Sequence, residues 1–127
     1  GGVFVRAHDQ AALASWYREH LGVDIDDEWH GAILPGPVGS SDGSGGIWSA
    51  FPEDTKYFGS QQNQFMINFR VANRDAMLTQ LREAGCDVDE RTEDSEYGHF
   101  GWVTDPEGNR VELWQEPTDS DDEEKPA

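Results

Sequence analysis

The chain repeats its own pattern at an offset of 64 residues, and this repeat constrains the fold more than any other feature. Asp9, a suitable helix N-cap, falls on Asn73, and the glycines that end the two predicted helices, Gly22 and Gly85, correspond after a one-residue adjustment. A β-rich segment precedes each helix, and further short strands follow it. Because a single copy would expose one apolar face, we expect the two copies to pair.

The same order of elements is expected in both copies. The first copy is predicted to contain a strand at 1–7, a helix at 9–22, one or two short strands within 23–34 and a strand at 47–51. The second is predicted to contain a strand at 65–72, a helix at 73–85, a strand at 86–91 and a hairpin of strands 99–104 and 110–115. The fold class is therefore α+β, with one domain over 1–117 built from modules of about 1–60 and 61–117. Residues 35–46 are expected to be a flexible connection, and 118–127 an acidic disordered tail.

Charge and cysteine content narrow the possible functions. The net charge of -17, with 26 acidic residues, argues against a nucleic-acid partner, because few basic side chains remain to neutralise phosphates. No apolar run is long enough to span a membrane, and no leader segment is visible. Cys86 is the single cysteine, which fits a reducing cytoplasm, and we expect it to be a small buried hydrophobe.

Three segments resemble a known superfamily. "GGVFVRAHDQAALASWYREHLGV" and "FGWVTDPEGNRVELWQEP" resemble the opening and closing motifs of the vicinal oxygen chelate superfamily, and "FMINFRVANRDAMLTQLREAG" is similar to the start of its second module. That superfamily includes glyoxalase I, bleomycin resistance proteins and extradiol dioxygenases. The resemblance covers nearly all of 1–117. It implies two paired βαβββ modules, a cup-shaped mixed sheet with the helices on its outer face, and usually a homodimer.

The resemblance also implies a divalent metal in the cup, held by His, Gln or Glu on the first and last strands of each module. Carried over one position at a time, the four ligand places fall at Gly2, near Trp48 or Ser49, at about Met66 and at Glu112. A catalytic Zn²⁺ or Ni²⁺ site needs at least three nitrogen or oxygen donors from the protein. Only Glu112 matches, so we expect no cofactor and no metal-dependent glyoxalase or dioxygenase activity. A divalent metal remains the alternative if the ligands lie at other positions.

Strand alternation suggests what the cup holds instead. The candidate ligand-binding side chains are Phe4, Arg6, Trp48, Asn68, Arg70, Trp102, Glu112 and Trp114. Arg6 and Arg70 are mates in the repeat and could bind a ligand carboxylate through a bidentate fork, while the tryptophans stack on the body of the ligand. In the other interpretation, Glu112 bridges one of these arginines, and the cluster only makes a buried charge tolerable.

Three functions are compatible with these features. The first, which we favour, is a metal-free binder of a small organic molecule, in the manner of the bleomycin-resistance branch. The second is a metal-dependent lyase, isomerase or dioxygenase of the same superfamily. The third is a structural or regulatory dimer whose cup is filled by its own side chains. The acidic surface suits a cationic ligand and the paired arginines an anionic or zwitterionic one, so the sequence leaves the ligand open.

Overall fold

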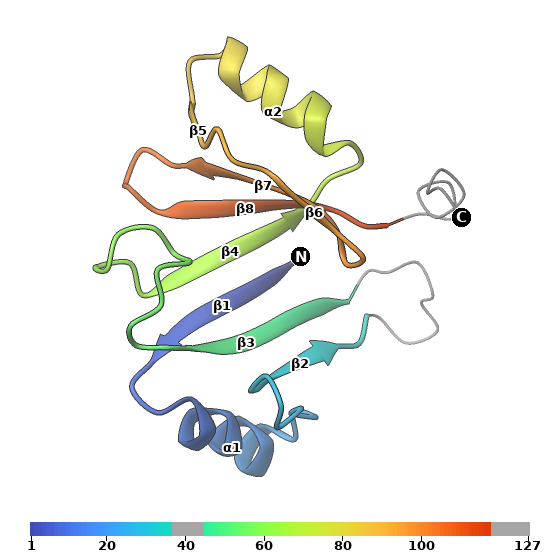
Figure 1. Cartoon of the computed structure of the whole chain (residues 1–127). Helices are drawn as coiled ribbons and strands as arrows, with labels where there is room; N and C mark the ends of the chain where they lie inside the picture. Colours follow the sequence, from blue (N-terminus) through green and yellow to red (C-terminus); the bar gives the residue numbers. More distant parts are fainter. Residues whose placement is uncertain (37–44, 118–127) are drawn as a thin grey trace. The chain divides into compact units, whose positions relative to one another are not determined.

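The computed structural model describes residues 1–36 and 45–117 (Figure 1). The chain divides into two compact units, Gly1–Asn68 and Phe69–Ala127. The described residues form two helices and eight strands of mixed direction, so the α+β class predicted from the repeat is confirmed. The predicted acidic tail, and residues 37–44 of the predicted connection, lie outside the described residues. No helix in the described part of the chain is long and apolar enough to cross a membrane.

The first unit has one helix and a sheet of mixed direction. Its elements are β1 (Gly2–Ala7), α1 (Gln10–Leu21), β2 (Gly31–Leu34), β3 (Gly46–Pro52) and most of β4 (Phe65–Arg70). The strand order is β2-β3-β1-β4, in which β1 is parallel to β3 and antiparallel to β4. Only one strand forms within the predicted range 23–34, preceded by a single bridge between Asp26 and Gly31.

The ends of α1 follow from its capping residues. The Asp9 carboxylate accepts a hydrogen bond from the backbone N–H of Ala12 at 2.9 Å. At the other end Gly22 adopts a left-handed φ of 70°, which allows its N–H to close the helix on Arg18 O. The core beneath the helix comprises Ala14, Ile25 and Ala32, with Val23 and Trp48 packed against them.

The second unit is arranged around a long hairpin. Its elements are the end of β4, α2 (Arg74–Glu83), β5 (Asp87–Val88), β6 (Glu93–Ser95), β7 (Gly98–Thr104) and β8 (Arg110–Gln115). Strand β7 pairs antiparallel with β8, β5 and β6. The hairpin predicted from the turn at 105–109 is confirmed. The strand predicted at 86–91 shortens to two residues, and Cys86, which precedes it, is exposed rather than buried.

Asp105 organises the turn between β7 and β8. Its carboxylate accepts backbone hydrogen bonds from Glu107 and Asn109, both at 2.9 Å, and Gly108 takes a positive φ of 85°. These hydrogen bonds, chiefly the one from the Asn109 backbone, hold the pKa of Asp105 below its usual value. The "DPEGN" sequence therefore fixes the hairpin register that places the side chains of β8.

Candidate functional site

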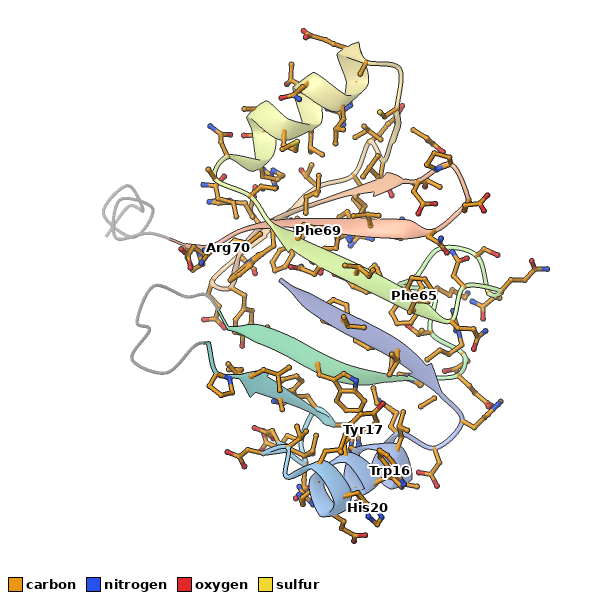
Figure 2. The ribbon with its side chains drawn as sticks, turned by 180° about the vertical axis from the view of Figure 1, so that it is seen from behind. Trp16, Tyr17, His20, Phe65, Phe69 and Arg70 are labelled. Carbon is orange, nitrogen blue, oxygen red and sulfur yellow. The ribbon has the colours of Figure 1, made fainter. Side chains whose placement is uncertain are left out.

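In the first unit, strand register defines the face opposite α1. Phe4 lies opposite Ser49 on β3 and Met66 on β4, so these three side chains share that face with Asn68. Trp48 pairs with Val3 and lies on the other face. There its ring packs 4.4 Å from that of Tyr17 on α1 (Figure 2 labels Tyr17). Placing Trp48 in a ligand-binding wall was therefore wrong, because a shift of one residue along a strand reverses the face.

An aromatic cluster that was not predicted covers the face opposite α1. The ring of Phe51 lies 5.3 Å from Phe4, 5.7 Å from Tyr57 and 5.2 Å from Phe58. Phe58 is completely buried, whereas Phe4, Phe51 and Tyr57 keep part of their surface exposed. Residues 52–64 are mostly polar in the sequence, and the adjacent Tyr57 and Phe58 are the signal there that the segment folds back onto the sheet. The first unit thus presents an aromatic surface made partly by a loop.

Arg6 fastens that loop to the sheet. Its Nε donates to Asn63 O at 2.9 Å, and its Nη1 donates to Glu53 O at 2.7 Å and Thr55 O at 2.8 Å. The guanidinium carbon lies 5.3 Å from the centre of the Phe58 ring. Backbone carbonyls thus take up Nε and Nη1 of Arg6, which gives this arginine a structural role; its predicted roles as a ligand fork or as the bridge to Glu112 stay predictions. Its repeat mate Arg70, at the end of β4 (Figure 2), lies 3.8 Å from the Glu116 carboxylate.

In the second unit, the β7–β8 register sorts the side chains onto two faces. Trp102 lies opposite Glu112, and Phe100 lies opposite Trp114. Gly101 and Leu113 lie on the other face, toward α2, where a Cβ added to Gly101 would come within 2.9 Å of Leu78. The alternation predicted for β8 is therefore correct: Glu112 and Trp114 share the face opposite α2.

Glu112 is a buried carboxylate rather than part of a wet sheet surface. Glu112 and Trp102 are each 1 % exposed, and Trp102 Nε1 donates to Glu112 Oε1 at 3.2 Å. The Arg110 guanidinium lies over the Trp102 ring, 4.9 Å from its centre, and Nη1 donates to Asp89 Oδ2 at 3.0 Å. The Trp102 ring is thus covered by neighbouring groups; it donates a hydrogen bond to Glu112 and supports the Arg110 guanidinium. It offers no free ring surface for stacking on a ligand.

Hydrogen bonds also hold Trp114 and Asp89 in the second unit. Trp114 is half-buried and donates from Nε1 to Tyr97 O at 2.7 Å, which fixes its ring beside the β6–β7 turn. The pKa of Asp89 is lowered, chiefly by the hydrogen bond from the Arg91 backbone N–H and also by the hydrogen bond and charge of Arg110. Asp89 is therefore ionised at neutral pH and forms a true ion pair with Arg110.

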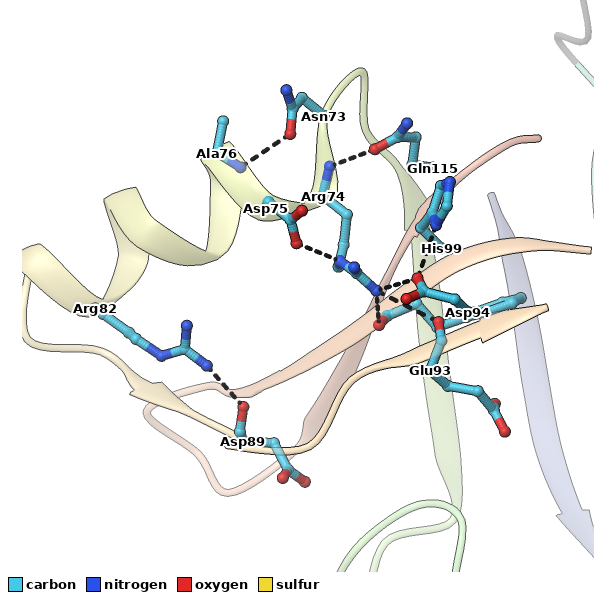
Figure 3. A network of polar contacts seen from close by, with 11 residues as sticks. Asn73, Arg74, Asp75, Ala76, Arg82, Asp89, Glu93, Asp94, His99 and Gln115 are labelled. Atoms are coloured by element: carbon cyan, nitrogen blue, oxygen red, sulfur yellow. Dashed lines mark hydrogen bonds and ion pairs between the residues drawn. The ribbon is translucent and has the colours of Figure 1, made fainter. Parts of the chain in front are cut away.

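A buried arginine on α2 forms a separate polar network (Figure 3), which the sequence interpretation missed. Arg74 is 6 % exposed; it contacts the Asp75 carboxylate at 2.9 Å and Asp94 at 3.0 Å, and donates to Phe100 O at 2.8 Å. His99 Nδ1 lies 2.7 Å from the same Asp94 oxygen. Arginine in the first turn of a helix usually faces water, so only the structure reveals this role. The network ties α2 to β6 and β7.

The pKa of Asp94 depends on the polar network around Arg74. The hydrogen bond to His99 and then the charge and hydrogen bond of Arg74 hold the pKa of Asp94 below its usual value. A lowered folded-state pKa means that this carboxylate stabilises the fold above its unfolded pKa. That contribution is lost as the pH falls through the folded-state value.

The side chains at the four family ligand positions do not fit a divalent metal. A Cβ at Gly2 would lie 2.6 Å from Ile47 O, so no side chain is tolerated there without a backbone shift. Met66 is wholly buried and offers only a thioether, and Ser49 points its hydroxyl toward Trp29 O at 3.5 Å. Among the described residues, no group of three or more His, Cys, Asp or Glu side chains could hold a metal ion. Glu112 alone is an insufficient donor set.

A match over most of the chain shows the family to which this protein belongs. A family model described as the glyoxalase-like domain matches residues 2–114. The chain belongs to this family, and the resemblance to the vicinal oxygen chelate superfamily is confirmed. No curated protein matches the chain significantly.

Solved structures support the same fold. Methylmalonyl-CoA epimerase from Mycobacterium tuberculosis has a TM-score of 0.63 at 20 % identity, covering 92 % of this chain and 87 % of that one. The epimerase from Streptomyces coelicolor reaches 0.65 at 18 % identity, over 92 % and 96 %. A glyoxalase/bleomycin resistance protein/dioxygenase superfamily member from Vibrio splendidus reaches 0.61 at 13 % identity, over 90 % and 96 %. At these identities the likeness establishes the fold alone.

Proposed function

We propose that this chain is a member of the glyoxalase-like family that binds a small organic molecule without a divalent metal. The observation that carries the proposal is the donor chemistry at the family ligand positions. Gly2 has no room for a side chain, Met66 is a buried thioether, and Ser49 is a hydroxyl held near a backbone carbonyl. Hard divalent cations prefer carboxylate and carbonyl oxygens, and Zn²⁺ prefers imidazole, thiolate or carboxylate ligands, so this set selects against both kinds of ion.

The surfaces opposite the helices supply the binding chemistry. In the first unit the partly exposed rings of Phe4, Phe51 and Tyr57 offer apolar contact. In the second unit, the partly exposed guanidinium of Arg110 offers a fixed polar group on the same face of β8 as the buried Glu112. Aromatic contacts and fixed polar groups are both typical of small-molecule sites, so each unit by itself offers a candidate binding surface. A cytoplasmic location belongs to the same proposal, since the lone Cys86 needs no oxidising compartment.

A measurement of metal binding separates this proposal from the alternative, a metal-dependent lyase, isomerase or dioxygenase. Glu112 is the one family ligand position that favours this alternative. We expect the protein dialysed against Zn²⁺, Ni²⁺ or Fe²⁺ to retain well under one equivalent by elemental analysis. Glu112→Gln should give the same result, because the glutamine oxygen can still accept the Trp102 N–H. One equivalent of metal in the wild type that disappears in Glu112→Gln would refute the metal-free function and establish the alternative.

We also propose that the protein is a homodimer joined through an apolar strip on β1 and β4, comprising Val3, Phe65 and Ile67. These side chains are 42 %, 40 % and 36 % exposed, and Val3 lies directly opposite Ile67 (Figure 2 labels Phe65). A twofold interface must be complementary to itself, and an uncharged apolar strip satisfies this condition. On a chain with a net charge of -17, such a strip also lets two copies meet without opposing acidic side chains.

A single charged substitution tests the dimer. Ile67→Lys should convert the dimer to monomer in sedimentation-velocity experiments, because it buries an unpaired ammonium group in the interface. Ile33→Lys, at a more exposed strand position on β2, is the matched control and should leave the dimer intact. A wild-type monomer, or dissociation by the Ile33 substitution alone, would contradict the proposed interface.

A further inference from the structure

Arg110 presents one unused edge of its guanidinium. Nη1 is paired with Asp89 at 3.0 Å, and the plane of the group rests on the Trp102 ring. Nε is buried, and among the described residues it has no hydrogen-bond partner. Nε and Nη2 lie on the same edge of a guanidinium, with their N–H bonds parallel. Asp89 and Trp102 therefore hold the Nε–Nη2 edge of Arg110 in a fixed orientation. The buried Nε–H on this edge has no acceptor among the described residues.

An unsatisfied buried donor needs a physical explanation. The large majority of buried side-chain polar atoms in proteins have a hydrogen-bond partner, and leaving one without a partner is costly. In the described residues only one other buried side-chain atom, Arg6 Nη2, lacks a partner, and the rest of Arg6 is occupied by the loop that it fastens. Arg110 differs because its single hydrogen bond is donated by Nη1, which leaves both Nε and Nη2 without a partner among the described residues. A ligand oxygen is the natural acceptor for that edge.

The charges around Arg110 select the kind of oxygen. Asp89 already neutralises the guanidinium, and Glu112 lies on the same face, two residues along β8. A guanidinium already neutralised by Asp89 gains little from a second anion, and the net charge of -17 repels one. An uncharged carbonyl oxygen accepts two N–H bonds from a guanidinium edge without this repulsion. The site therefore favours neutral acceptors over carboxylates and phosphates.

We propose that Arg110 is the specificity-determining residue of the ligand site, and that it recognises the carbonyl oxygen of a small uncharged compound such as a ketone or an amide. This inference rests on the proposed small-molecule function and narrows it to a class of ligand. It also replaces Arg6 and Arg70 with a different arginine as the cation that contacts the ligand. Trp102 and Asp89 act as positioning residues, because they orient the guanidinium without touching the ligand.

Three probes of one shape test the inference on the full chain. Acetophenone carries the carbonyl oxygen, α-methylstyrene replaces that oxygen with a methylene group, and benzoate replaces the methyl ketone with a carboxylate. Binding is followed by ¹H–¹⁵N NMR at the Nε–H of Arg110 and at the indole N–H of Trp102, assigned with Arg110→Gln and Trp102→Phe. We expect acetophenone to shift the Arg110 Nε–H signal saturably, and the other two probes to bind at least tenfold more weakly.

Matched variants separate recognition from a change in fold. Arg110→Gln should abolish the preference for acetophenone over α-methylstyrene. Arg82→Gln removes an exposed arginine that donates only to Asp89 O and should preserve that preference. Equal binding of acetophenone and α-methylstyrene, or tighter binding of benzoate, would overturn the inference. So would saturable shifts confined to other residues, although these would leave the small-molecule function standing. Stoichiometric metal uptake would instead refute that function.

Discussion

Trp102→Ala is expected to lower the free energy of unfolding by about 3–5 kcal/mol, the usual cost of removing a buried tryptophan from a core. Among the described residues, Trp102 is the largest fully buried side chain; its Nε1 donates to the Glu112 carboxylate, and the Arg110 guanidinium lies over its ring. Its removal leaves a cavity beside a buried carboxylate that has lost a donor. Equilibrium unfolding in urea, followed by circular dichroism, measures the change.

Two further variants divide this effect into its parts. Trp102→Phe keeps most of the ring but removes the N–H that bonds Glu112, and should cost about 1–3 kcal/mol. Trp16→Ala removes a tryptophan that is half exposed on α1 (Figure 2) and should change stability by less than about 1 kcal/mol. A Trp102→Ala protein as stable as Trp16→Ala would contradict the burial of Trp102 and, with it, the support of Arg110.

Arg74→Met is expected to destabilise the second unit by about 2–4 kcal/mol, since buried acceptors lose their donor and Asp94 loses a cation. The methionine keeps the aliphatic packing while removing the contacts with Phe100 O and Asp94 (Figure 3). The estimate stays below that for a fully buried ion pair, because the Asp94 side chain is more than half exposed to water. Urea unfolding measures the loss.

Hydrogen exchange gives this prediction a local signature. Amides of β6, Glu93–Ser95, should exchange faster in Arg74→Met, because Arg74 is a principal link between that short strand and α2. Arg82→Met, on the same helix but with one hydrogen bond to Asp89 O, should change stability by about 0.5 kcal/mol or less. Unchanged exchange in β6 would show that the strand is held by its pairing with β7 alone.

Capping and turn residues made much of each unit predictable. Asp9, Asn73 and Gly22 fixed helix ends that the structure reproduces, because their side-chain and backbone chemistry acts within a few residues. The "DPEGN" turn fixed the hairpin register, so alternation then placed Glu112 and Trp114 on the correct face. Local chemistry was sufficient to predict the helix ends and the hairpin, because the interacting residues are close in sequence.

The main errors at the candidate site involve partners distant in sequence. The choice between Trp48 and Ser49 depended on the register of β3 against β1, which no turn specifies. Arg6 was assigned to a ligand because the carbonyls that it binds, more than forty residues away, leave no mark on residue type. Strand β6 consists of three polar residues without alternation and forms only because β7 and Arg74 hold it.

The close approach at Gly2 limits how this protein could be redesigned. The nearest atom to a Cβ at that position would be a main-chain oxygen of the neighbouring strand, which cannot rotate away as a side chain would. An engineer who wished to install a catalytic ion could not begin by swapping glycine for histidine, since β1 and β3 would first have to separate. The spacing of β1 and β3 therefore excludes a metal-binding side chain at position 2 unless the backbone moves.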